Sequence, residues 1–180
     1  MRTGLMVLCF VGVAACSQMG MKSPGQSAGQ GATASTQDAK FARDITQANL
    51  AEIETGKLAA SKAQSDAVKQ FAQHMVDEHS KLLKQGNDLA AAKGMEVPSS
   101  PGLEHQAAKT KLQIMTAASF DRAYMEQIVK DHNTTLDLLK KTAAEASDPQ
   151  LRAQAQQAIP HVQQHLEMAQ RLAAQTASAR

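Results

Sequence analysis

Cysteine and aromatic residues are scarce in this 180-residue sequence, which has two Cys, no Trp and 3% aromatic residues. Both cysteines, Cys9 and Cys16, lie in the first sixteen residues, so the rest of the chain can form neither a disulfide nor a thiolate metal site. A glycine-rich nucleotide-binding loop is missing, as is a Ser/His/Asp or Cys/His arrangement for nucleophilic catalysis. The sequence therefore provides no catalytic residues and favours a protein that is not an enzyme.

Acidic residues are missing from residues 1–37, which carry only two charged side chains, Arg2 and Lys22. The rest of the chain has 17 Lys plus Arg and 17 Asp plus Glu, and is neutral before histidine. Proteins that bind nucleic acid concentrate excess positive charge on one face, so we expect no nucleic-acid partner. A hydrophobic content of 43% is enough to form a core and excludes wholesale disorder.

The first fifteen residues have the pattern of an export signal. Arg2 is followed by the apolar run of residues 4–13 (GLMVLCFVGV), which is too short to span a bilayer as a permanent helix. The run ends in Val-Ala-Ala-Cys16, which resembles the lipobox of bacterial lipoproteins, in which the cysteine becomes the lipid-bearing N-terminus. We expect a membrane anchor at Cys16, and the alternative is an ordinary secretory signal cleaved nearby.

The residues after Cys16 bear on location. Ser17 rather than Asp follows the cysteine, which in a Gram-negative cell favours the outer membrane, with inner-membrane retention as the alternative. Residues 16–37 are rich in Ser, Gly, Gln and Ala and have too few bulky apolar residues to offset the entropy of ordering. We predict a flexible tether that holds residues 38–180 on the periplasmic side of a bacterial membrane.

From Asp38 onward, helical patterns dominate and strand signals are nearly absent, so we predict an all-α domain. Apolar residues recur at steps of three and four in four long segments. The expected N-caps of these segments are Asp38, Ser65, Ser119 and Asp148, the last followed by a proline suited to a first helical position. Residues 94–102 contain two prolines and two glycines and must be a loop, and a shorter helix is expected over residues 103–115.

Four such helices must bury their apolar stripes against one another. The connections near residues 64 and 148 are tight, so each flanking pair should form an antiparallel hairpin. The segment of residues 94–118 is long enough to cross the whole bundle. We therefore predict a ferritin-like four-helix bundle with a crossover linker that contains a short extra helix, and the alternative is simple up-down-up-down packing.

Each apolar stripe contains one polar residue at a core position. These residues are Glu52, His79, His132 and His165, one on each long helix. Carboxylate and imidazole ligands suit Fe, Zn, Mn, Ni or Cu, so we predict that the four residues bind a transition metal. Further residues that can act as additional ligands or support the site are Glu54, Asp77, Glu78, Asp121, Tyr124, Asp131 and His161.

The sequence lacks the motifs of two common metal sites. A di-iron ferritin centre needs Glu-x-x-His on two helices, but Val76 precedes His79 by three residues and Val162 precedes His165. The pair His161 and His165 lacks the glutamate of the zinc-protease motif His-Glu-x-x-His. The alternative to a metal site is a set of histidines that serve only as core residues.

Four runs of the chain form an ordered set: AEIETGKLA (51–59), VKQFAQHMVDEH (68–79), FDRAYM (120–125) with His132, and IPH (159–161) with His165. Through this set, over about residues 38–175, the chain resembles the DUF4142 family. The family's recurring positions coincide here with Glu52, Glu54, His79, Asp121, Tyr124, His132, Pro160 and His165. One departure is Glu78, where the family commonly has Asp before the histidine.

Membership of this family would imply a ferritin-like helical bundle in an exported protein, often labelled an outer-membrane protein. It implies no established reaction. Two functions of different classes therefore remain: an envelope-tethered protein that binds a metal ion in its bundle, with a role in metal or oxidative stress, or a non-catalytic structural or interaction bundle. Loss of the histidines without loss of fold or partner binding would favour the second.

Overall fold

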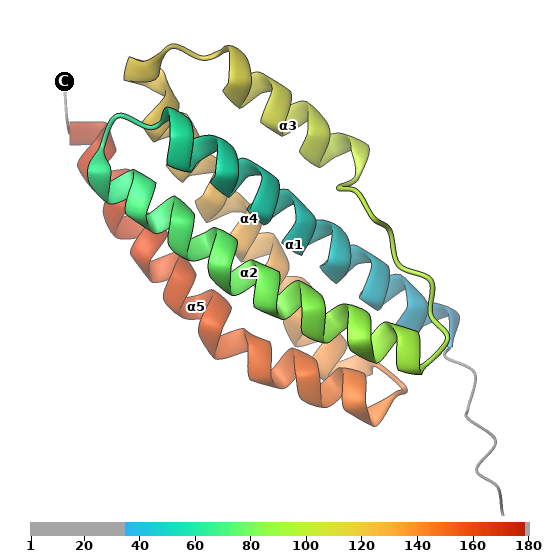
Figure 1. The fold of residues 1–180 in the computed structure, drawn as a ribbon. Helices are drawn as coiled ribbons and strands as arrows, with labels where there is room; N and C mark the ends of the chain where they lie inside the picture. Colours follow the sequence, from blue (N-terminus) through green and yellow to red (C-terminus); the bar gives the residue numbers. More distant parts are fainter. Residues whose placement is uncertain (1–34, 179–180) are drawn as a thin grey trace, which may run out of the picture. The chain divides into compact units, whose positions relative to one another are not determined.

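The computed structural model describes residues 35–178, which form five helices and no strand (Figure 1). The helices are α1 (Thr36–Lys62), α2 (Asp66–Ala92), α3 (Leu103–Ile114), α4 (Ala117–Glu145) and α5 (Pro149–Ser178). Within this part of the chain, no helix is both long and apolar enough to cross a membrane. The predicted signal, the lipid anchor at Cys16 and most of the tether lie outside the described residues.

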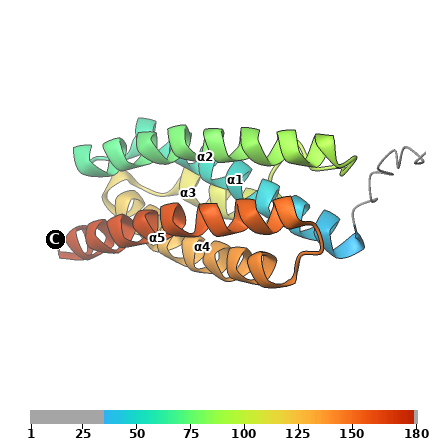
Figure 2. The ribbon, with the colours of Figure 1, turned by 90° about the horizontal axis from the view of Figure 1, so that it is seen from below.

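The four long helices pair as two hairpins, α1 with α2 and α4 with α5, which pack into a bundle (Figure 2). The ends of the hairpins show their relative direction. Asp121 near the start of α4 accepts hydrogen bonds from the Gln64 and Ser65 amides in the α1–α2 turn, so α4 begins where α1 ends. The segment after α2, with α3 in it, therefore runs the length of the bundle, and the predicted ferritin-like crossover is confirmed over up-down-up-down packing.

The helix starts differ from the predicted ones at two of four places. Ser35, not Asp38, caps α1, and its hydroxyl accepts a hydrogen bond from the Asp38 amide at 3.0 Å. The Asp38 carboxylate is turned instead to the α4–α5 turn, where it accepts from the amides of Ser147 and Asp148. The prediction for α4 was also wrong, because the helix is capped at Thr116 rather than Ser119. Local sequence does not distinguish among closely spaced Ser, Thr and Asp, because all of these side chains can accept from free amides.

Other predicted ends are confirmed. Ser65 is the N-cap of α2, although its side chain makes no capping hydrogen bond, and Gly94 after α2 has the positive φ of 63° that glycine tolerates. Asp148 accepts hydrogen bonds from the amides of Gln150 and Leu151 at the start of α5. The short helix lies within one residue of its predicted end. Pro160 lies inside α5, and the helix continues beyond it to Ser178.

Small residues allow the helices of the first hairpin to approach closely. A Cβ atom at Gly56 on α1 would lie 2.9 Å from Cγ2 of Val76 and 3.1 Å from the carbonyl oxygen of Ala72, both on α2. Large side chains of α4 fill the core, where Phe120, Tyr124 and Met125 are fully buried. The four polar stripe residues predicted from the sequence all lie inside this bundle.

Candidate metal centre

Three histidines from three helices meet in the middle of the bundle. His79 on α2, His132 on α4 and His165 on α5 are 3%, 1% and 2% exposed. One ring nitrogen from each lies within 4.8 Å of the other two. The ring centroids are 5.4 to 5.7 Å apart. The sequence predicted that these residues face inward, and the structure brings their imidazoles together.

Asn49 on α1 determines which nitrogen of His79 faces the cluster. The Asn49 amide nitrogen donates to the Ile45 carbonyl at 3.0 Å, so its oxygen is left to accept. That oxygen lies 2.9 Å from Nδ1 of His79. Nδ1 must therefore carry the proton, and the lone pair lies on Nε2, which is buried and has no hydrogen-bond partner.

His132 has the same arrangement with different partners. Its Nδ1 lies 3.1 Å from the Ile128 carbonyl oxygen, which can only accept, and 3.4 Å from Oε1 of Glu52. The proton therefore belongs on Nδ1, and Nε2 is again buried without a partner. Burial alone would lower the pKa of His132 and raise that of Glu52, but their mutual attraction outweighs it, raising the first and lowering the second. A carboxylate on the far nitrogen is the usual way in which a metal-binding histidine is oriented.

His165 presents Nδ1, which is buried and unpartnered. Burial, followed by the neighbouring histidines, lowers the pKa of His165 to about 3, and burial lowers the pKa of His79 to about 4. Both rings are therefore neutral at physiological pH. A neutral imidazole with a free lone pair is the form that binds metal ions.

Five buried side-chain atoms in the described residues lack a hydrogen-bond partner, and three of them belong to this cluster. The full set is Nε2 of His79, Nε2 of His132, Nδ1 of His165, Oε2 of Glu52 and the hydroxyl of Tyr124. Leaving a buried polar group unpaired costs about 1–3 kcal/mol, so several together are unusual unless a ligand satisfies them. One unpaired nitrogen from each of three rings is the donor set of a metal ion held by three histidines.

Glu52 lies beside the cluster rather than within the three-nitrogen group. Oε1 of Glu52 lies 3.4 Å from Nδ1 of His132, on the side of the ring away from Nε2. Its other oxygen, Oε2, remains without a partner, as does the fully buried hydroxyl of Tyr124. The role of Glu52 as a fourth ligand stays a prediction.

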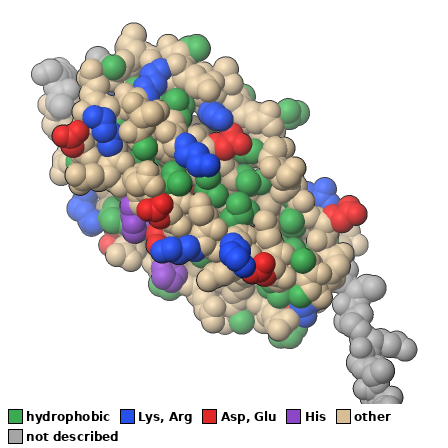
Figure 3. All heavy atoms as spheres, in the orientation of Figure 1, with side chains coloured by type: hydrophobic (Ala, Val, Ile, Leu, Met, Phe, Trp, Pro, Cys, Tyr) green, Lys and Arg blue, Asp and Glu red, His purple; other side chains and the backbone are tan. Residues whose placement is uncertain are grey.

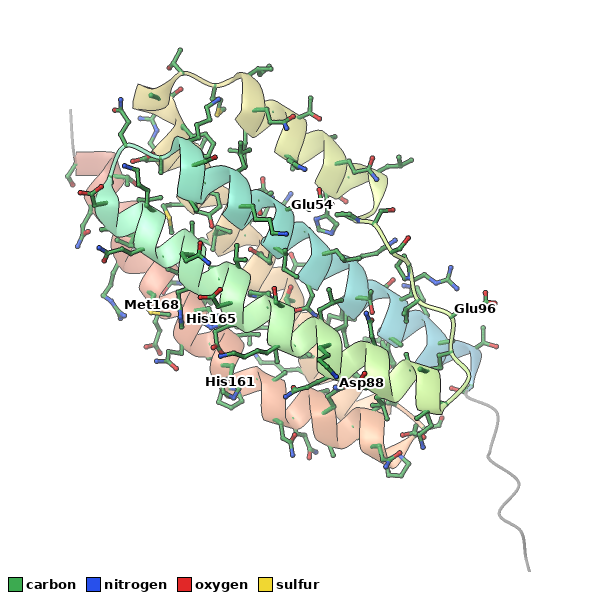
Figure 4. All side chains as sticks on the ribbon, in the orientation of Figure 1. Glu54, Asp88, Glu96, His161, His165 and Met168 are labelled. Carbon is green, nitrogen blue, oxygen red and sulfur yellow. The ribbon has the colours of Figure 1, made fainter. Side chains whose placement is uncertain are left out.

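Several predicted supporting residues contact other groups. Glu54 binds Lys109 of α3, Asp77 accepts from Gln73, and Glu78 binds Lys81. Asp121 caps the α1–α2 turn, as described above. His161 lies on the exposed side of α5, one turn before His165 (Figure 4).

Asp131 is half-buried and accepts from Gln127. Burial raises its pKa. It lines a cavity of about 280 Å³ between α1, α3 and α4, together with Glu52 and His105. Asp131 thus lies near the carboxylate side of the cluster.

Sequence reasoning missed two residues, Asn49 and His74. Asn49 lies one turn before Glu52 on the buried face of α1, so a polar residue at a core position was the available signal. His74 of α2 is exposed, and its ring meets that of His165 edge-on at 5.5 Å. Nothing in its helical spacing predicted that contact.

The fold and site define a class: a four-helix bundle with a crossover connection and a buried cluster of three histidines. The chain belongs to the family described as a domain of unknown function, DUF4142, whose model matches residues 23–172. The crystal structure of a DUF305 fragment from Deinococcus radiodurans is similar in fold, with a TM-score of 0.71 and 13% sequence identity over 79% of this chain and 98% of the fragment. This similarity shows the fold alone. No curated protein sequence matches the chain significantly.

Proposed function

We propose that the protein binds one transition-metal ion through Nε2 of His79, Nε2 of His132 and Nδ1 of His165. The observation that carries this proposal is that one ring nitrogen from each of three buried histidines lies within 4.8 Å of the other two. Each of the three rings also has one buried nitrogen without a hydrogen-bond partner. Asn49 and Glu52 hold the proton of His79 and His132 on the opposite nitrogen, which keeps the ligand nitrogens free.

Three imidazoles suit Zn, Cu, Fe or Ni better than Ca or Mg, which prefer oxygen ligands. A three-nitrogen set leaves at least one coordination position for a further ligand or a small exogenous molecule. A site of this kind can store or transfer a metal ion, and with a redox-active metal it can serve in the response to metal or oxidative stress. The proposal assigns no catalytic residue.

The test is elemental analysis of residues 35–180, purified without a histidine tag and titrated with Fe, Zn, Cu and Mn. We expect near-stoichiometric metal in the unaltered protein and none in a His79→Ala/His165→Ala variant that remains helical. His161→Ala is the matched control, because His161 is exposed on α5 and should leave the metal content unchanged. If the unaltered protein binds none of these metals, the metal proposal is wrong, and the structural or interaction bundle becomes the better hypothesis.

We also propose that the full chain is anchored to a bacterial membrane by lipid on Cys16, with the bundle on the periplasmic side. The sequence Val-Ala-Ala-Cys16 after an apolar run supports this. Mass spectrometry of the mature protein should find a lipid-modified Cys16 at the N-terminus, and Cys16→Ser should release the protein into the soluble fraction. A mature N-terminus at another residue would contradict the anchor.

A further inference from the structure

A fourth imidazole connects the buried cluster to solvent. His74 is exposed on α2, and its ring lies 5.5 Å from that of His165 at an interplanar angle of 83°. The His165 ring in turn lies 5.4 Å from that of His79 and 5.7 Å from that of His132. The four rings therefore form a continuous path from the surface to the centre of the bundle.

This path follows the α2–α5 boundary, where the backbones of neighbouring long helices make the fewest close approaches. The two helices of each hairpin pack extensively, and α1 packs against α4 more closely than α2 packs against α5. Figure 3 shows histidine side chains at the surface where α2 and α5 meet.

The charge around His74 also favours a cation. Glu78 lies one helical turn after His74 on the same face of α2, which places its carboxylate near both His74 and His165. Lys81 pairs with one oxygen of Glu78 at 2.7 Å, which keeps the Glu78 carboxylate ionised and offsets part of its charge. A carboxylate beside an exposed imidazole attracts a divalent metal ion, but two imidazoles at this boundary hold it less firmly than the three inside.

The other candidate route is the cavity between α1, α3 and α4, lined by Glu52, His105 and Asp131. A metal ion that arrives from this side meets the Glu52 carboxylate first, and behind it the protonated Nδ1 of His132 rather than the lone pair on Nε2. This route therefore leads to the wrong side of the His132 ring.

We propose that His74 is a transient metal ligand through which ions enter and leave the three-histidine site, passing from His74 to His165. The proposal rests on the proposed function, since it concerns how that site is loaded. Because His74 lies outside the final donor set, it changes the barrier to exchange and leaves the bound state unaltered.

The experiment measures the rates of Zn²⁺ loading and of Zn²⁺ release to a chromogenic chelator, together with the equilibrium affinity. We expect His74→Ala to slow loading and release alike by about tenfold or more, with the affinity changed less than about twofold. His161→Ala, another exposed histidine near the same boundary, should leave all three unchanged. The melting temperature of each variant confirms that the fold is intact.

Three outcomes would overturn the proposal. Loading by His74→Ala at the unaltered rate would show that ions take another route, and slower loading by His105→Ala/Asp131→Asn would identify the α1–α3–α4 cavity as that route. A large loss of affinity in His74→Ala would make His74 a permanent ligand instead. If the unaltered protein binds no Zn²⁺, then the proposed function itself fails for this metal, and the loading route fails with it.

Discussion

The two helical hairpins share one framework, in which residues of the first correspond to residues of the second. The core contains two sets of corresponding positions, and only one of these sets contains the histidine cluster. Asp38 and Asp121 lie 83 positions apart in the sequence, and each accepts hydrogen bonds from two amides in the turn of the other hairpin. The turns that donate these hydrogen bonds, residues 64–65 and 147–148, are separated by the same 83 positions. The bundle thus has an approximate two-fold arrangement in which each hairpin caps its partner.

The match extends along α1 and α4. Ala63 and Ala146 end the two helices with amides bonded to the carbonyls of Ala59 and Thr142, again at corresponding positions. Near the middle, Asn49 and His132 correspond, and each bonds through its side chain to the carbonyl of an isoleucine four residues earlier. The backbone framework therefore repeats down to individual hydrogen bonds.

The core side chains differ between the two sets of corresponding positions. The counterparts of His79, His165 and Glu52 are Val162, Leu82 and Thr135. These three line an apolar cavity of about 40 Å³, next to the histidine cluster. The same framework thus accommodates mostly apolar residues at the corresponding positions, so we expect the bundle to fold without the histidines.

The largest effect is expected when the histidine positions are given the residues found at their corresponding positions. In His79→Val/His165→Leu, each histidine is replaced by the residue at its counterpart position, and metal binding should be lost completely. The metal-free protein should be at least as stable as the unaltered one, because unpaired buried nitrogens are removed. Metal content and urea unfolding measure the two effects, and a strongly destabilised metal-free variant would show that the histidines are structural.

The next largest effect is expected at Asp38 and Asp121, the two carboxylates that accept hydrogen bonds from the turn of the other hairpin. Asp38→Ala and Asp121→Ala each remove a carboxylate that accepts from two backbone amides, so each should lower the free energy of unfolding by about 1.5–3 kcal/mol. Asp88→Ala, which loses only an exposed pair with Lys84, should cost less than about 0.5 kcal/mol. Urea titrations of the three variants decide this, and a large effect at only one of the two caps would show that their energies are not equivalent.

A smaller effect is expected from a substitution of Asn49, the residue that corresponds to His132. Asn49→Ala removes the acceptor that holds the proton on Nδ1 of His79, so metal affinity should fall by about tenfold or more while one metal still binds. Competition with a chelator measures the change. An unchanged affinity would mean that His79 is oriented by packing alone.

The last prediction concerns the pH dependence of the metal-free protein, where the raised pKa of His132 offsets part of the effect of the other two histidines. The folded pKa values of His79 and His165, about 4 and about 3, lie below the unfolded value near 6.5, so folding favours their neutral forms. Protonating these buried rings costs stability, so the metal-free protein loses stability as the pH falls from 6.5 toward 4, while the raised pKa of His132 opposes this loss. Melting temperatures should fall over this range, and His79→Val/His165→Leu should fall less. An equal fall of the melting temperature in both proteins would show that groups other than His79 and His165 cause the pH dependence.

Helical periodicity made much of the fold predictable. Steps of three and four predicted the long helices, the two tight turns and the crossover, and the same steps placed Glu52 and the three histidines in the core. Predictions failed where they depended on a choice among similar local groups. Asp38 and Ser119 are reasonable caps on sequence alone, but Ser35 and Thr116 occupy those positions, and Asp38 is drawn to amides that are distant in sequence.

By itself, the sequence determined which residues face inward, because helical periodicity depends only on neighbours along the chain. Only the tertiary structure decided which inward residues meet and through which atoms. The rotation and spacing of the helices place His74 against His165, turn Nε2 of His79 and His132 to the centre, and put Glu52 on the far side of the His132 ring. These distances join different helices, so no pattern within a single helix contains them.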